Sequence, residues 1–438
     1  MIIKRPALTL LRLPAYILLF MMLMFPMVME MLYIKALLFI LSLYLVVIAT
    51  MRRGRLRLHP LIVLWALFMT SVILFFAFRG FIADTPGALK QAQVYGLWPL
   101  VYLVLISGAV DSKIWIGIQR TMVISTICIA TYGLLYVFTE LQVLPRFIDL
   151  NFFENESTPA IGYYGGFIEL RVLGLNTLTF LIPFCMAALI FWSTEKRSAA
   201  TGQTCLWVAV LLGVTLDILS ARRALWLVTL LTPLFIFLLW LLLVRKERLT
   251  NIRAMASKVS FLCLFLSTLA FLSSHLYEFN LVKMAEEFVG GFDFSGIGQG
   301  EAARAEQLDA LVRGWLEHPI LGAGLGASAE AYGSVRSERP WEYELYYVAL
   351  LYQVGIIGFI FLASGVVWTY FMGVRIIKRD KMLRRSMLPI LVGMLSMLIA
   401  NATNPYLVRF DGIWVIFLPL IPINNWLLNQ RQQKIFVE

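Results

Sequence analysis

Charged residues are scarce in this sequence. They make up 14% of its 438 residues, whereas hydrophobic residues make up 60%. A soluble globular protein carries about 25% charged residues, and a chain with so few polar groups does not cover its own surface with them. This composition excludes an ordinary soluble domain and predicts that lipid solvates much of the protein.

Cysteine and histidine are also rare, with four and three residues. The cysteines all lie in apolar runs and none belongs to a Cys-x-x-Cys pair, so we expect buried thiols and neither a disulfide framework nor a thiolate metal site. The histidines are too scattered to form a metal site together. We therefore expect no metal ion and no cofactor. The cysteines are Cys128, Cys185, Cys205 and Cys263.

Long apolar runs are abundant. About 20 residues of helix cross the ~30 Å hydrocarbon core of a bilayer. These runs predict an all-α, polytopic membrane protein with about 12 transmembrane helices. The tenth run is too long for one crossing, and we expect it to begin outside the membrane and to enter near Gly355. The predicted spans are 13–29, 31–50, 60–78, 93–110, 114–138, 173–193, 204–220, 224–243, 258–274, 345–374, 387–403 and 412–429.

The net charge of +11 suggests either a nucleic-acid partner or a signal for membrane orientation. Most lysines and arginines lie in alternate connections between the runs, and most acids lie in the others. Lysine and arginine in short connections mark the cytoplasmic side. We therefore expect both termini in the cytoplasm and no nucleic-acid partner.

Only two connections are long, and both fall on the outer side. Loops longer than about 15 residues are usually functional or disordered; the larger one carries tryptophans and a helical pattern over 301–317, so we expect it to be ordered and partly helical. The chain then has three parts. Residues 1–274 hold nine spans and a smaller outer loop at 139–172, residues 275–344 form the large outer loop, and residues 345–438 hold the last three spans.

Two arginines join two apolar runs with almost no loop between them. Arg222 and Arg223 follow Asp217 by little more than one helical turn. Charged groups at such depth are costly and usually functional. The alternative is a hairpin tip whose arginines reach the lipid headgroups or pair with Asp217.

The helical pattern in the large loop has one apolar face. At helical spacing Arg304 shares this face with Leu308 and Leu311. Arg304 therefore points inward and needs either a structural carboxylate or an anionic ligand as its partner. Arg313 lies on the opposite face, where it can pair with Asp309 four residues earlier.

Two further motifs follow this helix. His318-Pro319-Ile-Leu-Gly322-Ala-Gly324 predicts either a plain helix stop with a tight turn or a cradle for phosphate, although no strand precedes it as in a dinucleotide site. The segment Trp341-Glu-Tyr-Glu344 opens the long run. Acids at a helix N-terminus are favoured by the helix dipole; alternatively, Glu344 near two arginines is placed to act as a general base.

In this order the motifs resemble those of the bacterial O-antigen ligase and O-antigen polymerase superfamily, which are membrane glycosyltransferases of the GT-C type. That family has a Ser-Arg-Gly-Ala-like motif after a short outer turn, and its large periplasmic loop begins with an Arg helix. A His-Pro-Leu-Leu-Gly-x-Gly turn follows fourteen residues after that Arg, and a His-Asn motif precedes Gly-Leu-Ile-Gly by about ten residues.

The matching residues extend over roughly 165–360. Arg223 takes the first Arg position, and Arg304 stands fourteen residues before His318. The final motif is matched at 355–358, and Glu344 stands eleven residues before Gly355, where the ligases have His. Arg171-Val-Leu-Gly174-Leu-Asn176 is a looser match to an Arg-x-x-Gly…Asn segment of the family.

The resemblance implies metal-independent glycosyl transfer at the periplasmic face from an undecaprenyl-diphosphate-linked oligosaccharide. Arg223 and Arg304 would hold the diphosphate, since a guanidinium binds phosphate oxygens bidentately. Glu344 would take the proton from the attacking sugar hydroxyl. Further substrate-binding residues expected on the same basis are Arg222, Arg171, Asn176, His318, Gly322, Gly324 and Tyr343.

The sequence leaves three functions open. The replacement of the ligase His by Glu344 favours a polymerase, whose acceptor is another lipid-linked repeat unit. The alternative is a ligase that transfers the glycan to lipid A–core or to protein, and a flippase for lipid-linked sugars is less well supported. We expect a multi-pass protein of the bacterial inner membrane with a periplasmic active site and bound membrane lipid, and a chain-length regulator is a candidate partner.

Overall fold

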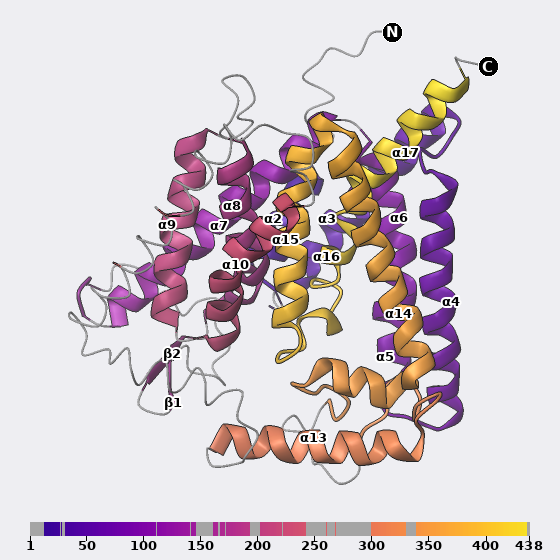
Figure 1. The fold of residues 1–438 in the computed structure, drawn as a ribbon, viewed down its shortest axis with the longest axis vertical. Helices are drawn as coiled ribbons and strands as arrows, with labels where there is room; N and C mark the ends of the chain where they lie inside the picture. The colour runs from indigo at the N-terminus through magenta and orange to yellow at the C-terminus, as the bar shows by residue number, and fades with distance from the viewer. Residues whose placement is uncertain are drawn as a thin grey trace. The chain divides into compact units, whose positions relative to one another are not determined.

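The computed structural model of the protein describes residues 13–26, 28, 31–110, 112–140, 142–145, 161–164, 167–170, 172–192, 202–220, 222–241, 260, 268, 299–329 and 339–435. Apart from residues 260 and 268, the predicted span 258–274 lies outside these residues, and so does much of both long outer loops. The described part is almost entirely helical (Figure 1).

Eight described helices are long and apolar enough to cross a membrane. Several such helices in one chain indicate a multi-pass membrane protein, because apolar helices of this length match the bilayer thickness. They are α3 (Leu32–Arg53), α4 (Pro60–Ile82), α7 (Ser112–Glu140), α8 (Leu178–Trp192), α9 (Gln203–Ser220), α10 (Arg223–Leu241), α14 (Tyr346–Arg379) and α15 (Lys381–Ala400).

Three other predicted spans form shorter helices in the described residues. The span at 93–110 begins with a π-helical turn, η1 (Gln93–Leu97), which follows α5 (Ala88–Ala92) and leads into α6 (Trp98–Gly108). The last span is interrupted between α16 (Trp414–Phe417) and α17 (Leu420–Ile435), where Pro419 lacks the N–H that a continuous helix needs. The first predicted span, 13–29, forms α2 (Leu13–Met24).

The chain forms two compact units, and each draws on separate stretches of sequence. Unit 1 comprises Met1–Phe39, Ile116–Phe292 and Ile377–Met397, and unit 2 comprises Ile40–Trp115, Asp293–Ile376 and Leu398–Glu438.

In unit 1, α8 forms the centre and packs against α9 and α10. Its large side chains Phe180, Ile182 and Phe184 are fully buried. The unit also contains an antiparallel hairpin of β1 (Ile161–Tyr164) and β2 (Phe167–Leu170), with Ile161 opposite Leu170. This hairpin is an exception to the expected all-α fold.

In unit 2, α13 (Gln299–Glu317) confirms the helix predicted over 301–317. It packs against the first turns of α14 through a core cluster that includes Leu311, Tyr343, Ala349 and Tyr352 (Figure 1). The helical geometry of α14 breaks at Gly355, which has φ 63° and ψ −176°. The break lies where the sequence predicts a change from an outer helix to a membrane span.

Candidate functional site

The buried face of α13 carries Arg304. Gln307, Ala310 and Leu311 are each at most 6% exposed, and Arg304 lies one turn before them with its side chain 26% exposed. The predicted inward orientation of Arg304 is confirmed. Arg313 lies on the exposed face and pairs with Asp309 at 2.8 Å, also as predicted.

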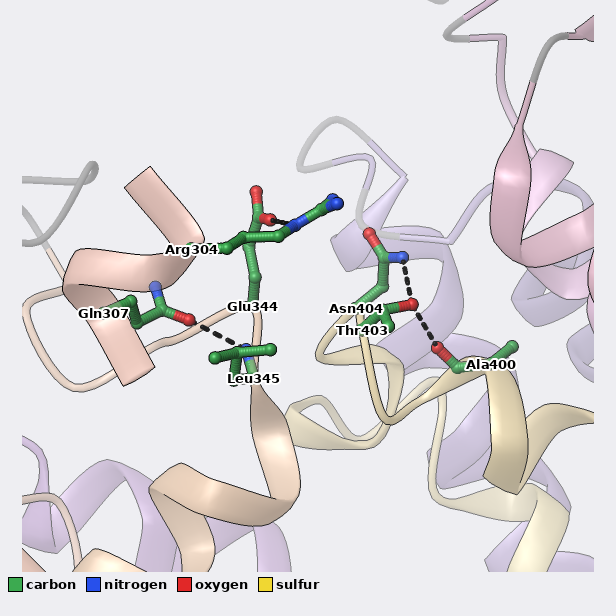
Figure 2. Close-up of polar contacts among 7 residues, drawn as sticks. All are labelled: Arg304, Gln307, Glu344, Leu345, Ala400, Thr403 and Asn404. Atoms are coloured by element: carbon green, nitrogen blue, oxygen red, sulfur yellow. Dashed lines mark hydrogen bonds and ion pairs between the residues drawn. The ribbon is translucent and has the colours of Figure 1, made fainter. Parts of the chain in front are cut away.

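The partner of Arg304 is Glu344. Its Nε donates to Oε2 of Glu344 at 2.8 Å, and the Glu344 side chain is 50% exposed (Figure 2). Gln307, one turn after Arg304, accepts a hydrogen bond of 2.8 Å from the backbone N–H of Leu345. This buried contact fixes the backbone next to Glu344. The sequence analysis did not single out Gln307, although its place on the inward face of the helix was a usable signal.

The turn at 319–324 and the break at 352–357 fit together, and we call this pair of segments the clasp. The break leaves carbonyls and N–H groups of α14 without helical partners. Ala323 and Gly324 donate their N–H groups to the carbonyls of Tyr352 and Gln353, each at 2.9 Å. The N–H groups of Ile356 and Ile357 donate in return to the carbonyls of residues 319 and 320, at 3.0 and 3.2 Å.

The clasp explains the spacing of the motifs. α13 leads into the turn of the clasp, and the first turns of α14 lead into its break, so Arg304 and Glu344 lie toward the far ends of two helical arms joined at the clasp. Helix length grows by about 1.5 Å per residue, so the residue counts from the clasp to Arg304 and to Glu344 determine whether the two side chains meet.

Three glycines of the clasp have positive φ angles, Gly322 and Gly324 in the turn and Gly355 in the break. Gly322 has φ 67° and Gly324 has φ 110°, and a Cβ atom on Gly322 would lie 2.5 Å from backbone atoms of Gln353. Both glycines are buried and their N–H groups are used within the fold, whereas His318 is exposed. Binding of substrate by these three residues stays a prediction.

Glu342 lies in surroundings different from those of Glu344. Its side chain is 6% exposed and pairs with Arg339 at 3.4 Å and with Arg409 at 3.7 Å. Tyr343, between the two acids, is 2% exposed, and its hydroxyl accepts a hydrogen bond of 2.6 Å from the N–H of Ala329. Tyr343 therefore packs in the core of unit 2.

A small pocket lies behind this segment. It has room for about one water molecule. A sugar ring does not fit there, so a large substrate would meet Arg304 and Glu344 from the exposed side. The pocket is lined by Gln91, Tyr95, Trp341, Tyr343, Tyr346, Ala349, Leu350, Gln353 and Val408.

The connection after α15 also faces the Arg304–Glu344 pair. The hydroxyl of Tyr347, three residues after Glu344, donates to the carbonyl of Leu398 at 2.6 Å. Figure 2 shows the guanidinium end of Arg304 pointing toward the amide of Asn404. The sequence analysis missed Asn404, because it lies just past the predicted span 387–403 in a connection without periodicity.

In unit 1, the turn between α9 and α10 places Arg222 and Arg223. Ser220 and Trp226 both donate to the backbone carbonyl of Asp217, at 2.7 and 2.8 Å, and hold the turn closed. Nε of Arg222 donates to the carbonyl of Leu170 at 3.1 Å. Arg223 is the first residue of α10. The two units are separate bodies, so a shared site of Arg223 and Arg304 stays a prediction.

Asp217 is 2% exposed, and its Oδ1 has no hydrogen-bond partner among the described residues. No ion pair joins it to Arg222 or Arg223 in the described part of the chain. The suggested pairing of Asp217 with these arginines is therefore not observed.

The looser motif 171–176 ends at the 3₁₀ turn η3 (Leu175–Thr177). Gly174 has φ 73°, and a Cβ atom there would lie 3.0 Å from the carbonyl oxygen of Met24. Thr177 donates to the carbonyl of Leu23 at 2.9 Å. The turn is thus packed on the end of α2. Asn176 is half-buried within it, and Arg171 lies outside the described residues.

Glu344 and Glu342 are each paired with an arginine, and the described residues contain no group of three His, Cys, Asp or Glu side chains that could hold a metal ion. Neither the models of known protein families nor the curated proteins contain a match to this chain.

Proposed function

We propose that the protein is a polysaccharide polymerase. It transfers a glycan from undecaprenyl diphosphate to a sugar hydroxyl of another lipid-linked repeat unit. The observation that carries the proposal is the pairing of Arg304 with Glu344, a cation and a carboxylate from distant parts of the sequence that meet on an exposed surface. The ordered motifs and the resemblance to the O-antigen polymerase and ligase superfamily supply the substrate class.

The reaction needs two groups of opposite character. The donor's anomeric carbon–oxygen bond breaks, and the electron pair leaves with the diphosphate, whose growing charge a guanidinium stabilises. The acceptor oxygen forms the new bond to the anomeric carbon and gives its proton to a carboxylate. Arg304 and Glu344 supply one group of each kind.

The weak pairing of Arg304 and Glu344 suits this role. Ion pairs on a solvent-exposed surface contribute only about 0–1 kcal/mol, so a diphosphate can compete for Arg304 at little cost. Oε1 of Glu344 forms no hydrogen bond with the described residues, which leaves it able to accept a proton.

The test compares two ion pairs of α13, namely Arg304 with Glu344 and Arg313 with Asp309. Arg304→Ala and Glu344→Gln remove the proposed site, whereas Arg313→Ala and Asp309→Asn remove an exposed pair of the same length. We expect the first two variants to lose polymer formation in a gel of extracted glycolipids and the last two to retain it, all at wild-type protein level. Normal chain length with Arg304→Ala or Glu344→Gln would refute the proposal.

A deletion strain separates the polymerase from the ligase. Loss of the ladder with one repeat retained on the glycolipid supports the polymerase. Loss of all attached repeats supports the ligase, for which the acceptor is lipid A–core.

A further inference from the structure

The surroundings of Arg304 and Glu344 include groups that the transfer reaction, as proposed, does not use. Arg304 pairs through Nε alone, and its two terminal amino groups form no hydrogen bond with the described residues. Figure 2 shows these amino groups directed toward the connection that carries Thr403 and Asn404. Both of these residues are half-buried, so they can contact a bound molecule.

The orientation of the Asn404 amide follows from its hydrogen bonds. The hydroxyl of Thr403 donates to the carbonyl of Ala400 at 3.4 Å, and this uses its only proton. Thr403 Oγ1 therefore accepts from Nδ2 of Asn404, which lies 3.3 Å away. The amide oxygen of Asn404 is left facing the Arg304–Glu344 pair, as Figure 2 shows.

This orientation decides what kind of group can bind. The amide oxygen of Asn404 and Oε1 of Glu344 both accept hydrogen bonds, so the space between them suits a hydrogen-bond donor and not a phosphate oxygen, and the diphosphate would approach Arg304 from another side. A sugar hydroxyl donates one hydrogen bond and accepts others, so it can give its proton to an acceptor and receive a bond from Arg304. Two neighbouring hydroxyls of one sugar can donate to both acceptors, one to Oε1 of Glu344 and the other to the amide oxygen of Asn404.

We propose that Asn404 is a positioning residue for the acceptor sugar and that it binds the hydroxyl next to the one that attacks. The attacking hydroxyl gives its proton to Glu344 as its oxygen bonds to the donor's anomeric carbon, and the diphosphate leaves with the electron pair of the broken bond. The neighbouring hydroxyl donates to Asn404 and accepts from Arg304. The site therefore selects an acceptor with two adjacent hydroxyls. This inference rests on the proposed function.

The experiment is a double-mutant cycle between protein and substrate. Purified protein in detergent is given a lipid-linked donor and two acceptor analogues, each with one hydroxyl beside the linkage position replaced by hydrogen. Wild-type protein and Asn404→Ala are compared on the natural acceptor and on both analogues. Asn429→Ala, at an exposed asparagine of α17, is the matched control.

A neutral hydrogen bond corresponds to roughly a 10-fold effect on kcat/KM. We expect a loss of about this size from Asn404→Ala on the natural acceptor. With one of the analogues we expect the wild type to show a similar loss and the variant to show no further loss. If the two losses multiply for both analogues, or if Asn404→Ala behaves like Asn429→Ala, the inference is wrong.

Two additional measurements separate a failure of the role of Asn404 from poor accumulation of the variant and from a failure of the proposed function. If Asn404→Ala does not accumulate, Thr403→Val removes the hydroxyl that orients the amide, and the same cycle applies. Glu344→Gln is assayed alongside: if it is inactive while Asn404→Ala is normal, only the role of Asn404 fails. If Glu344→Gln is also fully active, the proposed function fails with it.

Discussion

The clasp makes Gly355 a sensitive position, and we predict that Gly355→Ala strongly destabilises unit 2. Gly355 has φ 63° and ψ −176°, a region that is almost restricted to glycine and costs other residues about 1–3 kcal/mol. A Cβ atom there would clash with the carbonyl oxygen of Ile320 and lie 2.5 Å from the N–H nitrogen of Gly322. These are backbone atoms, so no side-chain rotation removes the clash.

The size of the effect follows from these contacts. Relief of the clash requires the two segments of the clasp to separate, which weakens the hydrogen bonds of Ile356 and Ile357 to the turn, each about 1 kcal/mol. Together with the backbone strain, we expect a loss of about 4 kcal/mol in the free energy of unfolding.

Gly54→Ala provides the control. Gly54 has φ 69°, but no atom lies within 4 Å of the place that a methyl group would take at this position. Gly54→Ala therefore measures only the cost of placing alanine in a left-handed backbone conformation, about 1 kcal/mol. Thermal unfolding of both variants in the same detergent compares them directly. We expect Gly355→Ala to melt several degrees below Gly54→Ala and to lose the proposed transferase activity. Equal melting temperatures would show that the clasp does not hold the two helices.

Two more changes test hydrogen bonds of the fold. Tyr343→Phe should lower the free energy of unfolding by about 1–3 kcal/mol, because it leaves the buried N–H of Ala329 without its acceptor; in thermal melts, the exposed Tyr33→Phe should show no such loss. Arg222→Lys should cost about 1 kcal/mol, since lysine lacks the Nε that donates to Leu170, and a melting temperature equal to that of Arg313→Lys would contradict this role.

Much of the local structure of α13 follows from sequence periodicity. The inward Arg304 and the outward Arg313–Asp309 pair both result from the 3.6-residue repeat, and the structure confirms both. The meeting of Arg304 with Glu344 depends on the clasp, whose hydrogen bonds join residues 29 or 37 positions apart in the sequence. The residues alone predicted an anionic partner for Arg304 and arginines near Glu344, and the spacing shared with the resembling family pointed to this particular pair.

Other features were beyond the reach of periodicity. Hydropathy does not detect the π-helical turn at Gln93–Leu97 or the interruption before α17, so it predicted more long spans than the described residues contain. Asn404 carries no signal of its own, because a single polar residue in a short connection is common. The role proposed for it rests on what lies opposite in space, namely the hydrogen bond to Thr403 and the direction of the Arg304 side chain.

The division of the chain into two units has a consequence for biosynthesis. Each unit takes residues from the beginning, the middle and the end of the sequence, and unit 1 includes Ile377–Met397. During translation the early helices of unit 1 must therefore wait for Ile377–Met397, and those of unit 2 for Leu398–Glu438, which both lie in the last quarter of the sequence. A premature stop before Met397 would leave both units incomplete, whereas a stop after it would truncate unit 2 alone.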